Sequence, residues 1–103
     1  MADPMKIRAN LVGDSTEVKV LMNHEMETGL RKDAQGKTIP AWFIQSVSAT
    51  WNGKSVLSAQ WGPAVSKNPF MSFKFKGGAK GDKVVITWVD SRGDQRTDEA
   101  TIA

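Results

Sequence analysis

The residues with the most suggestive chemistry in this 103-residue chain surround its single histidine. Met22, His24 and Met26 alternate along the sequence, so an extended backbone would place their side chains on one side. Two thioethers and an imidazole are ligands that suit Cu(I). The chain has no cysteine and no second histidine to complete such a site, and methionines near a histidine commonly fill a core. We therefore expect no metal and no other cofactor, and copper binding through His24 is the less favoured alternative.

A catalytic set of side chains is not evident in the sequence. No serine–histidine–aspartate arrangement can be read from it, and no nucleophile lies near His24. Glu25 and Glu27 are close together, but they belong to a charged segment, where carboxylates are usually solvated. The sequence predicts a binding protein with no catalytic residue, and not an enzyme.

The composition is typical of a single globular domain over residues 1–103. Hydrophobic residues make up 40% of the chain and charged residues 24%, with a net charge of +3. A mildly basic chain permits an anionic partner but does not require one. No segment is long enough to span a bilayer, and the first ten residues lack the apolar core of a signal peptide. We expect no membrane partner.

Lysines alternate with phenylalanines in residues 70–76, as they do in some RNA-binding sheets. Phe73 and Phe75 would share one strand face with Met71, however, while the lysines point the opposite way. A stacking platform needs aromatic and basic groups on the same exposed face. We predict core phenylalanines and no nucleic-acid partner. The glycine-rich turn "GGAKGD" also lacks the Gly-Lys-Ser/Thr of a phosphate loop.

A period of two dominates the chain and predicts strands, whereas no segment has sustained helical spacing. Turn signals separate the strands, and Asn52-Gly53 favours a two-residue hairpin. About seven short strands predict an all-β fold, an immunoglobulin-like antiparallel β-sandwich, with a small barrel as the alternative. The expected strands cover residues 6–11, 18–22, 43–51, 56–61, 71–76, 83–90 and 95–102.

Two runs, "AWFI" (41–44) and "VVITWV" (84–89), are apolar on both strand faces. A small sandwich has only one interior, so a second apolar face needs another cover, for which a partner subunit is the natural candidate. The alternative is that some of these positions lie near strand ends beneath loops. Without a partner, the same face could drive self-association. The predicted interface residues are Trp42, Ile44, Val85 and Trp88.

One long polar stretch, residues 23–38, interrupts the strands, and loops of this length are often functional. Arg31 could hold or steer an anion there, because its planar guanidinium can make two hydrogen bonds to an oxyanion. The alternative is that Arg31 pairs with Asp33 and only fixes the shape of the loop. The predicted docking residues of this stretch are His24, Met26, Glu27, Arg31 and Asp33.

Two blocks, "HEMETGLRKDAQGKTIPAWFI" and "SKNPFMSFKFKGGAKGDKVVITWVD", resemble the SoxZ family of thiosulfate-oxidising bacteria, and the likeness extends over essentially the whole chain. Proteins of this family are the small subunits of the SoxYZ sulfur-carrier complex and are similar to immunoglobulin-type sandwiches. The residues that carry the resemblance are His24, Met26, Glu27, Gly29, Arg31, Asp33, Gly36, Ile39, Pro40 and Phe43, followed by Ser66, Asn68, Pro69, Phe73 and Phe75.

The resemblance implies a non-enzymatic scaffold in thiosulfate oxidation. In the family, the partner SoxY carries sulfur intermediates on a C-terminal cysteine, and this cysteine-free chain would bind SoxY in a heterodimer or higher oligomer. The resemblance also implies transient contacts with other Sox enzymes. It implies a periplasmic location, reached by co-export with SoxY because this chain shows no signal peptide. The alternative function is a stand-alone periplasmic module that binds a ligand through its tryptophans, or copper.

Overall fold

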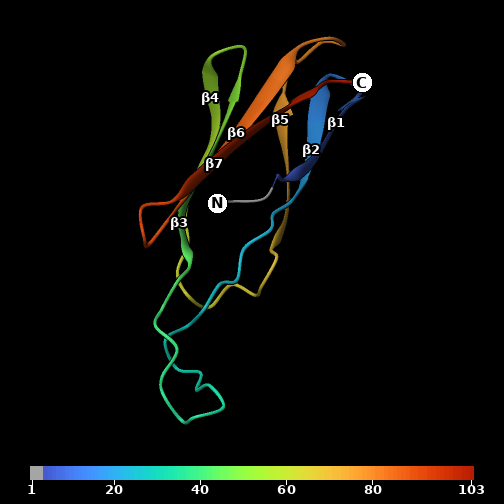
Figure 1. Ribbon diagram of the computed structural model, residues 1–103. Coiled ribbons are helices and arrows are strands. Elements are labelled where there is room, and N and C mark those ends of the chain that lie inside the picture. The colour runs from blue at the N-terminus through green and yellow to red at the C-terminus, as the bar shows by residue number, and fades with distance from the viewer. Residues whose placement is uncertain (1–3) are drawn as a thin grey trace.

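Alternating apolar and polar side chains form seven strands within residues 4–103, the part of the chain that the computed structural model describes (Figure 1). This range contains no helix, and therefore none long and apolar enough to cross a membrane. The predicted all-β antiparallel sandwich is confirmed; residues 1–3 of the predicted domain lie outside the described range. The strands are β1 (Lys6–Val12), β2 (Ser15–Leu21), β3 (Ile44–Trp51), β4 (Lys54–Gln60), β5 (Phe70–Lys76), β6 (Lys83–Asp90) and β7 (Gln95–Thr101).

The strands form two antiparallel sheets in an immunoglobulin-like arrangement. One sheet has the order β1-β2-β5 and the other the order β4-β3-β6-β7 (Figure 1). On one side of the sandwich, the last residue of the chain is bonded to β1. The Ala103 N–H donates to the carbonyl of Ala9 over 2.9 Å, and the Leu11 N–H donates to the carbonyl of Ala103 over 3.1 Å. These bonds tie the end of the chain, just after β7, to the first strand of the other sheet.

The β3–β4 hairpin turns through Asn52 and Gly53, as the sequence predicts. Both residues have positive φ, 48° and 82°, which is what a two-residue turn of this hand requires. Asparagine and glycine adopt this region at little cost, so the turn fixes where β3 ends and β4 begins.

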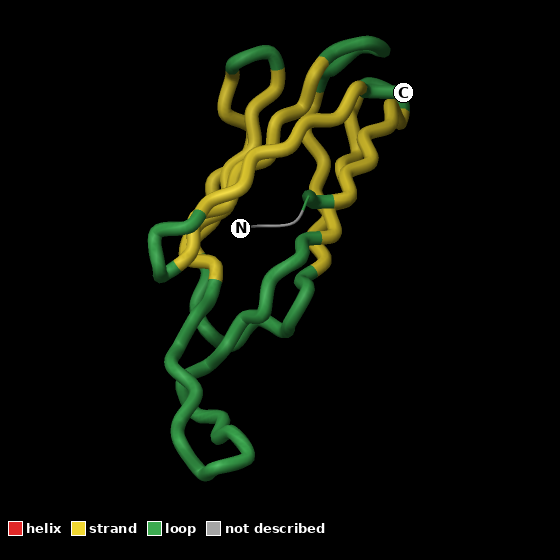
Figure 2. Tube along the Cα trace, viewed as in Figure 1, coloured by secondary structure: helices red, strands yellow, loops and turns green. Residues whose placement is uncertain are grey.

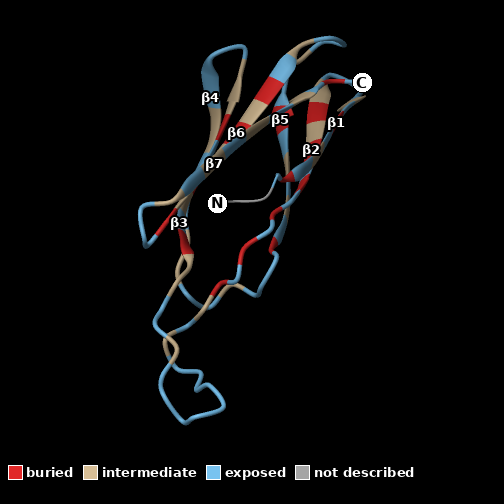
Figure 3. Cartoon of the chain, in the orientation of Figure 1, coloured by how far each residue is buried: buried red, intermediate tan, exposed pale blue. Residues whose placement is uncertain are grey.

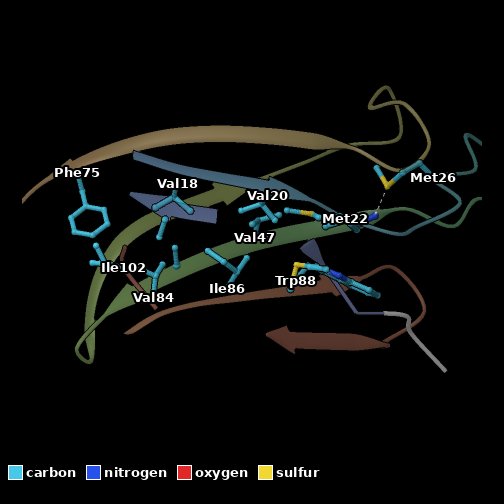
Figure 4. Close-up of a cluster of buried hydrophobic side chains, with 14 residues drawn as sticks. Val18, Val20, Met22, Met26, Val47, Phe75, Val84, Ile86, Trp88 and Ile102 are labelled. Carbon is cyan, nitrogen blue, oxygen red and sulfur yellow. Dashed lines mark hydrogen bonds between the residues drawn. The ribbon is translucent and has the colours of Figure 1, made fainter. Parts of the chain in front are cut away.

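The core fills the space between the two sheets (Figure 4). Val18 and Val20 of β2 face Val84, Ile86 and Trp88 of β6, and each of these side chains is at most 1% exposed. Buried positions alternate with exposed or half-buried ones along the strands (Figure 3). Because complete burial of each such side chain stabilises the fold by about 1.5–3 kcal/mol, this alternation fixes which face of each strand lies inside.

The positions predicted to face a partner divide between the core and the surface. Ile44 and Trp88 are 0% and 1% exposed, so the expectation that they contact a partner is corrected: both side chains belong to the core. Val85 points to the outer face of the same sheet and is half-buried, and Trp42 is half-buried in the loop that precedes β3. The apolar run of β6 therefore supplies one core face and one outer face.

Residues 22–43 leave the sandwich at one end as a long loop, drawn in cyan to green at the bottom of Figure 1 and in green in Figure 2. This loop makes the molecule elongated, with extents of 53 × 21 × 20 Å. It is longer than the predicted stretch of residues 23–38. Phe43, which was expected in a strand, still belongs to the loop, and β3 begins at Ile44.

Replacement of Gly78 by alanine is expected to destabilise the fold. Gly78 has a φ of +99°, and a Cβ there would overlap the Oγ1 of buried Thr16. That hydroxyl donates a hydrogen bond to the Gly77 carbonyl over 2.8 Å. We expect Gly78→Ala to lower the free energy of unfolding by at least about 3 kcal/mol in urea denaturation, through backbone strain and loss of this bond. Gly13→Ala is the control, because Gly13 also has a positive φ, +65°, but a Cβ added there would have no atom within 4 Å. It should cost only about 1–2 kcal/mol, and equal losses in the two variants would contradict the steric explanation.

Candidate functional site

The carboxylate of Asp90, at the end of β6, gathers four hydrogen-bond donors. Its Oδ2 accepts from His24 Nε2 over 3.0 Å and from Trp42 Nε1 over 2.7 Å. Its Oδ1 accepts from the backbone N–H groups of Arg92 and Asp94, each over 2.9 Å. Asp90 is 1% exposed, and burial alone would raise its pKa. The bonds from His24, Trp42 and the two backbone groups outweigh this effect, so the pKa of Asp90 is lowered and the group is a carboxylate.

The imidazole of His24 lies in the same network and has no free nitrogen. Its Nδ1 accepts the backbone N–H of Met26 over 3.0 Å, so its Nε2 carries the proton that is donated to Asp90. The ring is also packed between the indoles of Trp42 and Trp88, with centroid distances of 5.0 and 5.1 Å. A metal or a substrate could reach a lone pair of His24 only by breaking one of these bonds.

Met26 anchors the first leg of the loop inside the molecule. It is 5% exposed and adopts a φ of 52°, a backbone conformation that residues other than glycine rarely take. Its sulfur accepts the backbone N–H of Ile44 over 3.3 Å. His24 is also 5% exposed, so neither of these predicted docking residues is available at the surface. Across residues 4–103, no three His, Cys, Asp or Glu side chains come together in a way that could hold a metal ion.

Trp42 closes the network from the second leg of the loop. Its backbone pairs with that of Glu27 through hydrogen bonds of 2.6 and 3.0 Å, which join the two legs at their base. The guanidinium of Arg92 lies over the Trp42 ring, 4.5 Å from its centroid. Trp42 is thus held by the loop, by β6 and by the β6–β7 turn, and it covers the end of the core.

The tryptophans do not form a common ligand platform. Trp88 is in the core, and the Nε1 of Trp42 is bonded to Asp90. Trp51 donates to Asp82 over 2.9 Å and packs on Phe75 at the opposite end of the sandwich from the loop. The fourth tryptophan, Trp61, follows β4 and lines a depression with Phe43 and Gln60, a lining that includes no other tryptophan. The stand-alone ligand module suggested by the tryptophan count therefore has no support from their placement.

Arg31 pairs with Glu27 and not with Asp33. The Arg31 guanidinium donates from Nη2 to Glu27 Oε1 over 2.7 Å and from Nε to both carboxylate oxygens over 3.2 Å. Asp33 instead accepts the backbone N–H groups of Gln35 and Lys37 and so shapes the tip of the loop. The predicted Arg31–Asp33 pair is corrected, and an anion at Arg31 would have to compete with Glu27.

A shallow depression of about 370 Å³ lies beside this pair. Its lining includes Glu25 and Lys67, which form a second ion pair over 3.4 Å. The two carboxylates and two cations that line it are therefore matched. This balance does not favour a bound anion over a bound cation, so we assign no ligand to the depression.

The outer face of the four-stranded sheet is almost free of charge. The strand register places mainly serine, threonine, valine and glutamine there, and its charged residues, Lys83 and Glu99, form an ion pair over 3.5 Å at one end of the face. We call this surface the neutral face. It is formed by Ser55, Ser58 and Gln60 of β4, Ser46, Ser48 and Thr50 of β3, Lys83, Val85, Thr87 and Val89 of β6, and Gln95, Thr97, Glu99 and Thr101 of β7.

The profile of the family described as sulphur oxidation protein SoxZ matches residues 5–101. The chain belongs to the SoxZ family. Several family-motif residues of this SoxZ chain, namely His24, Met26, Glu27 and Arg31, build the base of the long loop. A comparison with curated proteins found no match.

Solved structures similar to this SoxZ chain share its fold at low sequence identity. A hypothetical protein from Pyrococcus horikoshii has a TM-score of 0.65 and 16% identity, with 99% of this chain and 89% of that chain covered. A superoxide reductase in the oxidised state has a TM-score of 0.64 and 16% identity, with the same coverage of 99% and 89%. A superoxide reductase (neelaredoxin) from Archaeoglobus fulgidus has a TM-score of 0.58 and 18% identity, with 97% and 86% covered. At such identities the likeness is one of fold alone.

Sequence reasoning singled out His24, Met26 and Trp42 but missed Asp90 and Arg92, which complete the network. A usable signal was present, because "DSRGD" places an aspartate at the end of an apolar strand and at the start of a tight turn. Its partners His24 and Trp42 lie 66 and 48 residues away, and no local pattern indicates them.

Asp90→Asn is expected to lower the free energy of unfolding by about 2–4 kcal/mol, because an amide N–H₂ would face two N–H donors or leave two backbone donors unpaired. The pKa of Asp90 is lowered in the folded state, so the unfolded chain takes up the proton first as the pH falls. The stability from Asp90 is therefore present above the ordinary aspartate pKa and is lost as the pH falls through its folded value. The free energy of unfolding, measured by urea denaturation from about pH 3 to 7, should fall less steeply with decreasing pH in Asp90→Asn than in the native chain. Asp14→Asn, at an exposed turn, is the control; equal slopes in all three proteins would refute the assignment.

Arg31→Gln is expected to leave the fold intact and to raise the pKa of Glu27. The Arg31 hydrogen bond is the largest cause of the lowered pKa of Glu27; the Arg31 side chain is exposed, whereas the Glu27 side chain is largely covered. Carboxyl-carbon NMR titration of Glu27 measures the change directly. Lys32→Gln removes a neighbouring charge without removing the bond, and it should shift the Glu27 pKa much less. A Glu27 pKa that is the same in both variants would contradict the bidentate pairing.

Proposed function

We propose that this SoxZ protein is a non-enzymatic scaffold subunit of the SoxYZ sulfur-carrier complex in thiosulfate oxidation. The observation that carries the proposal is the SoxZ family match over residues 5–101. The chain has no cysteine, so it cannot hold a sulfur intermediate on a thiol of its own. The cysteine that carries the intermediates would belong to SoxY, which this chain binds and positions.

Several features of the site support a binding role over a catalytic one. Both nitrogens of His24 are engaged inside the molecule, and the ring is shielded by two indoles. The Asp90 carboxylate is saturated with donors and serves to hold the loop. The likeness to superoxide reductases, at 16% identity and 18% identity, is one of fold and brings no activity to this chain.

The neutral face is the docking surface for SoxY in this proposal. Val85 and Val89 are half-buried among small hydroxyl side chains, and the charged pair Lys83–Glu99 lies at one end, so a partner can approach most of the face without desolvating a charged group. Stable protein complexes bury about 800 Å² on each partner, so the contact with SoxY would extend over most of this face. Trp42, half-buried at the base of the loop, lies beyond the strands that form this face and is a weaker candidate.

We further propose a periplasmic location, reached together with SoxY, and transient contacts with other Sox enzymes. The support for both is the carrier role of the family to which the chain belongs. A higher oligomer of the SoxYZ heterodimer is compatible with a chain that presents more than one sheet face.

The double variant Val85→Lys/Thr87→Lys is expected to fold and to lose SoxY. Two cations on the neutral face would have to be desolvated in the complex, so the Kd for SoxY should rise at least about 100-fold in calorimetric titration. The matched control is Asn10→Lys/Ser72→Lys, which adds the same charge to the outer face of the other sheet.

The possible results test the scaffold function and the docking surface separately. If the native chain does not bind purified SoxY, the scaffold function itself is refuted. If SoxY binds the native chain and the Val85→Lys/Thr87→Lys variant equally well, the function stands and the neutral face is excluded. Loss of SoxY only in the control variant would place the partner on the three-stranded sheet.

A further inference from the structure

The outer face of the three-stranded sheet has a different chemistry from the neutral face. Strand pairing aligns its outward side chains in four rows, one residue from each of β1, β2 and β5. We call this surface the basic face. Its rows are Lys6, Leu21 and Phe70; Arg8, Lys19 and Ser72; Asn10, Glu17 and Lys74; and Val12, Ser15 and Lys76.

This face accounts for the positive net charge of the chain. It carries five basic residues and one acidic residue, whereas the whole chain has 14 basic and 11 acidic residues. The rest of the chain has 9 basic and 10 acidic residues, so the excess of positive charge belongs to this face. A sheet face with one sign of charge raises the local concentration of anionic groups and speeds the association of an oppositely charged protein.

The charges of the basic face are poorly compensated within the molecule. Glu17 is shared between Lys19 at 3.7 Å and Lys74 at 3.9 Å. Arg8 stands directly opposite Lys19 in the β1–β2 register, and like charges in such cross-strand pairs are destabilising. Among residues 4–103, Arg8 has no ion-pair partner that would relieve this repulsion. A carboxylate supplied by another molecule would relieve it.

An exposed apolar pair lies at the loop end of the same face. Leu21 is 41% exposed and Phe70 is 62% exposed, and the two residues are direct cross-strand neighbours. Lys6 completes their row, so the apolar pair adjoins the charged rows. Adjacent large apolar side chains in solvent beside a charged patch are typical of a binding surface.

We propose that the basic face is a second docking surface and that its occupant is an acidic protein surface with an apolar side chain at one edge. The inference is independent of SoxY binding on the neutral face. A second copy of this chain is not the occupant, because two basic faces would repel each other. A nucleic acid would find one exposed aromatic ring on this face, Phe70, and not the series of rings on which successive bases stack, since Phe73 and Phe75 point into the sandwich. Glu17 near the centre of the face would repel phosphate groups of a lipid or nucleic acid, whereas a protein can match it with a cation.

The test uses the full chain labelled with ¹⁵N and a synthetic peptide of about twelve residues that is rich in aspartate and glutamate and has one leucine near its end. At low ionic strength, the peptide should shift the amide resonances of β1, β2 and β5 and leave those of the neutral face unchanged. The affinity should fall steeply as salt rises from about 0.02 to 0.2 M, because screening then reaches the distances between these charges. A peptide with serine in place of leucine should bind several-fold more weakly at every salt concentration.

Variants of the chain distinguish an effect of the basic face from an effect of the net charge. Arg8→Glu/Lys76→Glu should weaken peptide binding at least about tenfold at low salt. Lys32→Glu/Lys37→Glu makes the same change of net charge at the exposed loop tip and should weaken it less than about threefold. Phe70→Ser should reproduce the loss seen with the serine peptide. Circular dichroism confirms that each variant is folded before its affinity is compared.

Three results would overturn the proposal. The first is the absence of amide shifts on β1, β2 and β5 at low salt. The second is an equal loss of affinity in the Arg8→Glu/Lys76→Glu and Lys32→Glu/Lys37→Glu variants, which would reduce the effect to net charge. The third is tighter binding of a DNA duplex, or of phosphatidylglycerol vesicles, than of the peptide under the same conditions, which would assign the face to a nucleic acid or a membrane surface.

Discussion

The buried carboxylate of Asp90 is the constraint on which the loop end of this molecule depends. A desolvated carboxylate costs several kcal/mol unless donors surround it, so its four donors must all be in place together. They come from the first leg of the loop through His24, from the second leg through Trp42, and from the β6–β7 turn through two backbone groups. Satisfying one side chain therefore positions three segments that the chain order keeps far apart.

The two sheets, which this loop end joins, have outer faces of different composition. The neutral face combines small hydroxyl and valine side chains, which favours a close and lasting contact because little charge must be desolvated. The basic face combines five cations that share one carboxylate with the exposed pair Leu21 and Phe70, which favours fast and salt-sensitive encounters. In the proposed scaffold role, one face would hold a lasting partner and the other would meet transient ones, on opposite sides of one core.

Much of the fold could be predicted from the sequence because each strand must bury one face. The alternation of Ile7, Ala9 and Leu11, and the Asn52-Gly53 turn, mark strand and hairpin without help from distant residues. The interior position of Trp88 could not be predicted, because β6 is apolar on both faces and its phase depends on what packs against it. The site was less predictable still, because Asp90 and its partners meet only through tertiary contacts, and no local sequence pattern indicates them.

The way the long loop is held at its base has a practical consequence for where the chain can be divided. Both legs are fixed at their base by Asp90 and by the paired backbones of Glu27 and Trp42, whereas the tip beyond them is exposed, with Leu30 at 86%. The pairing of β2 with β5 is made by strand residues and not by the tip. Two fragments separated between residues 34 and 35 would retain that sheet pairing and could reassemble, which makes the tip a suitable place to split the protein or to insert a reporter.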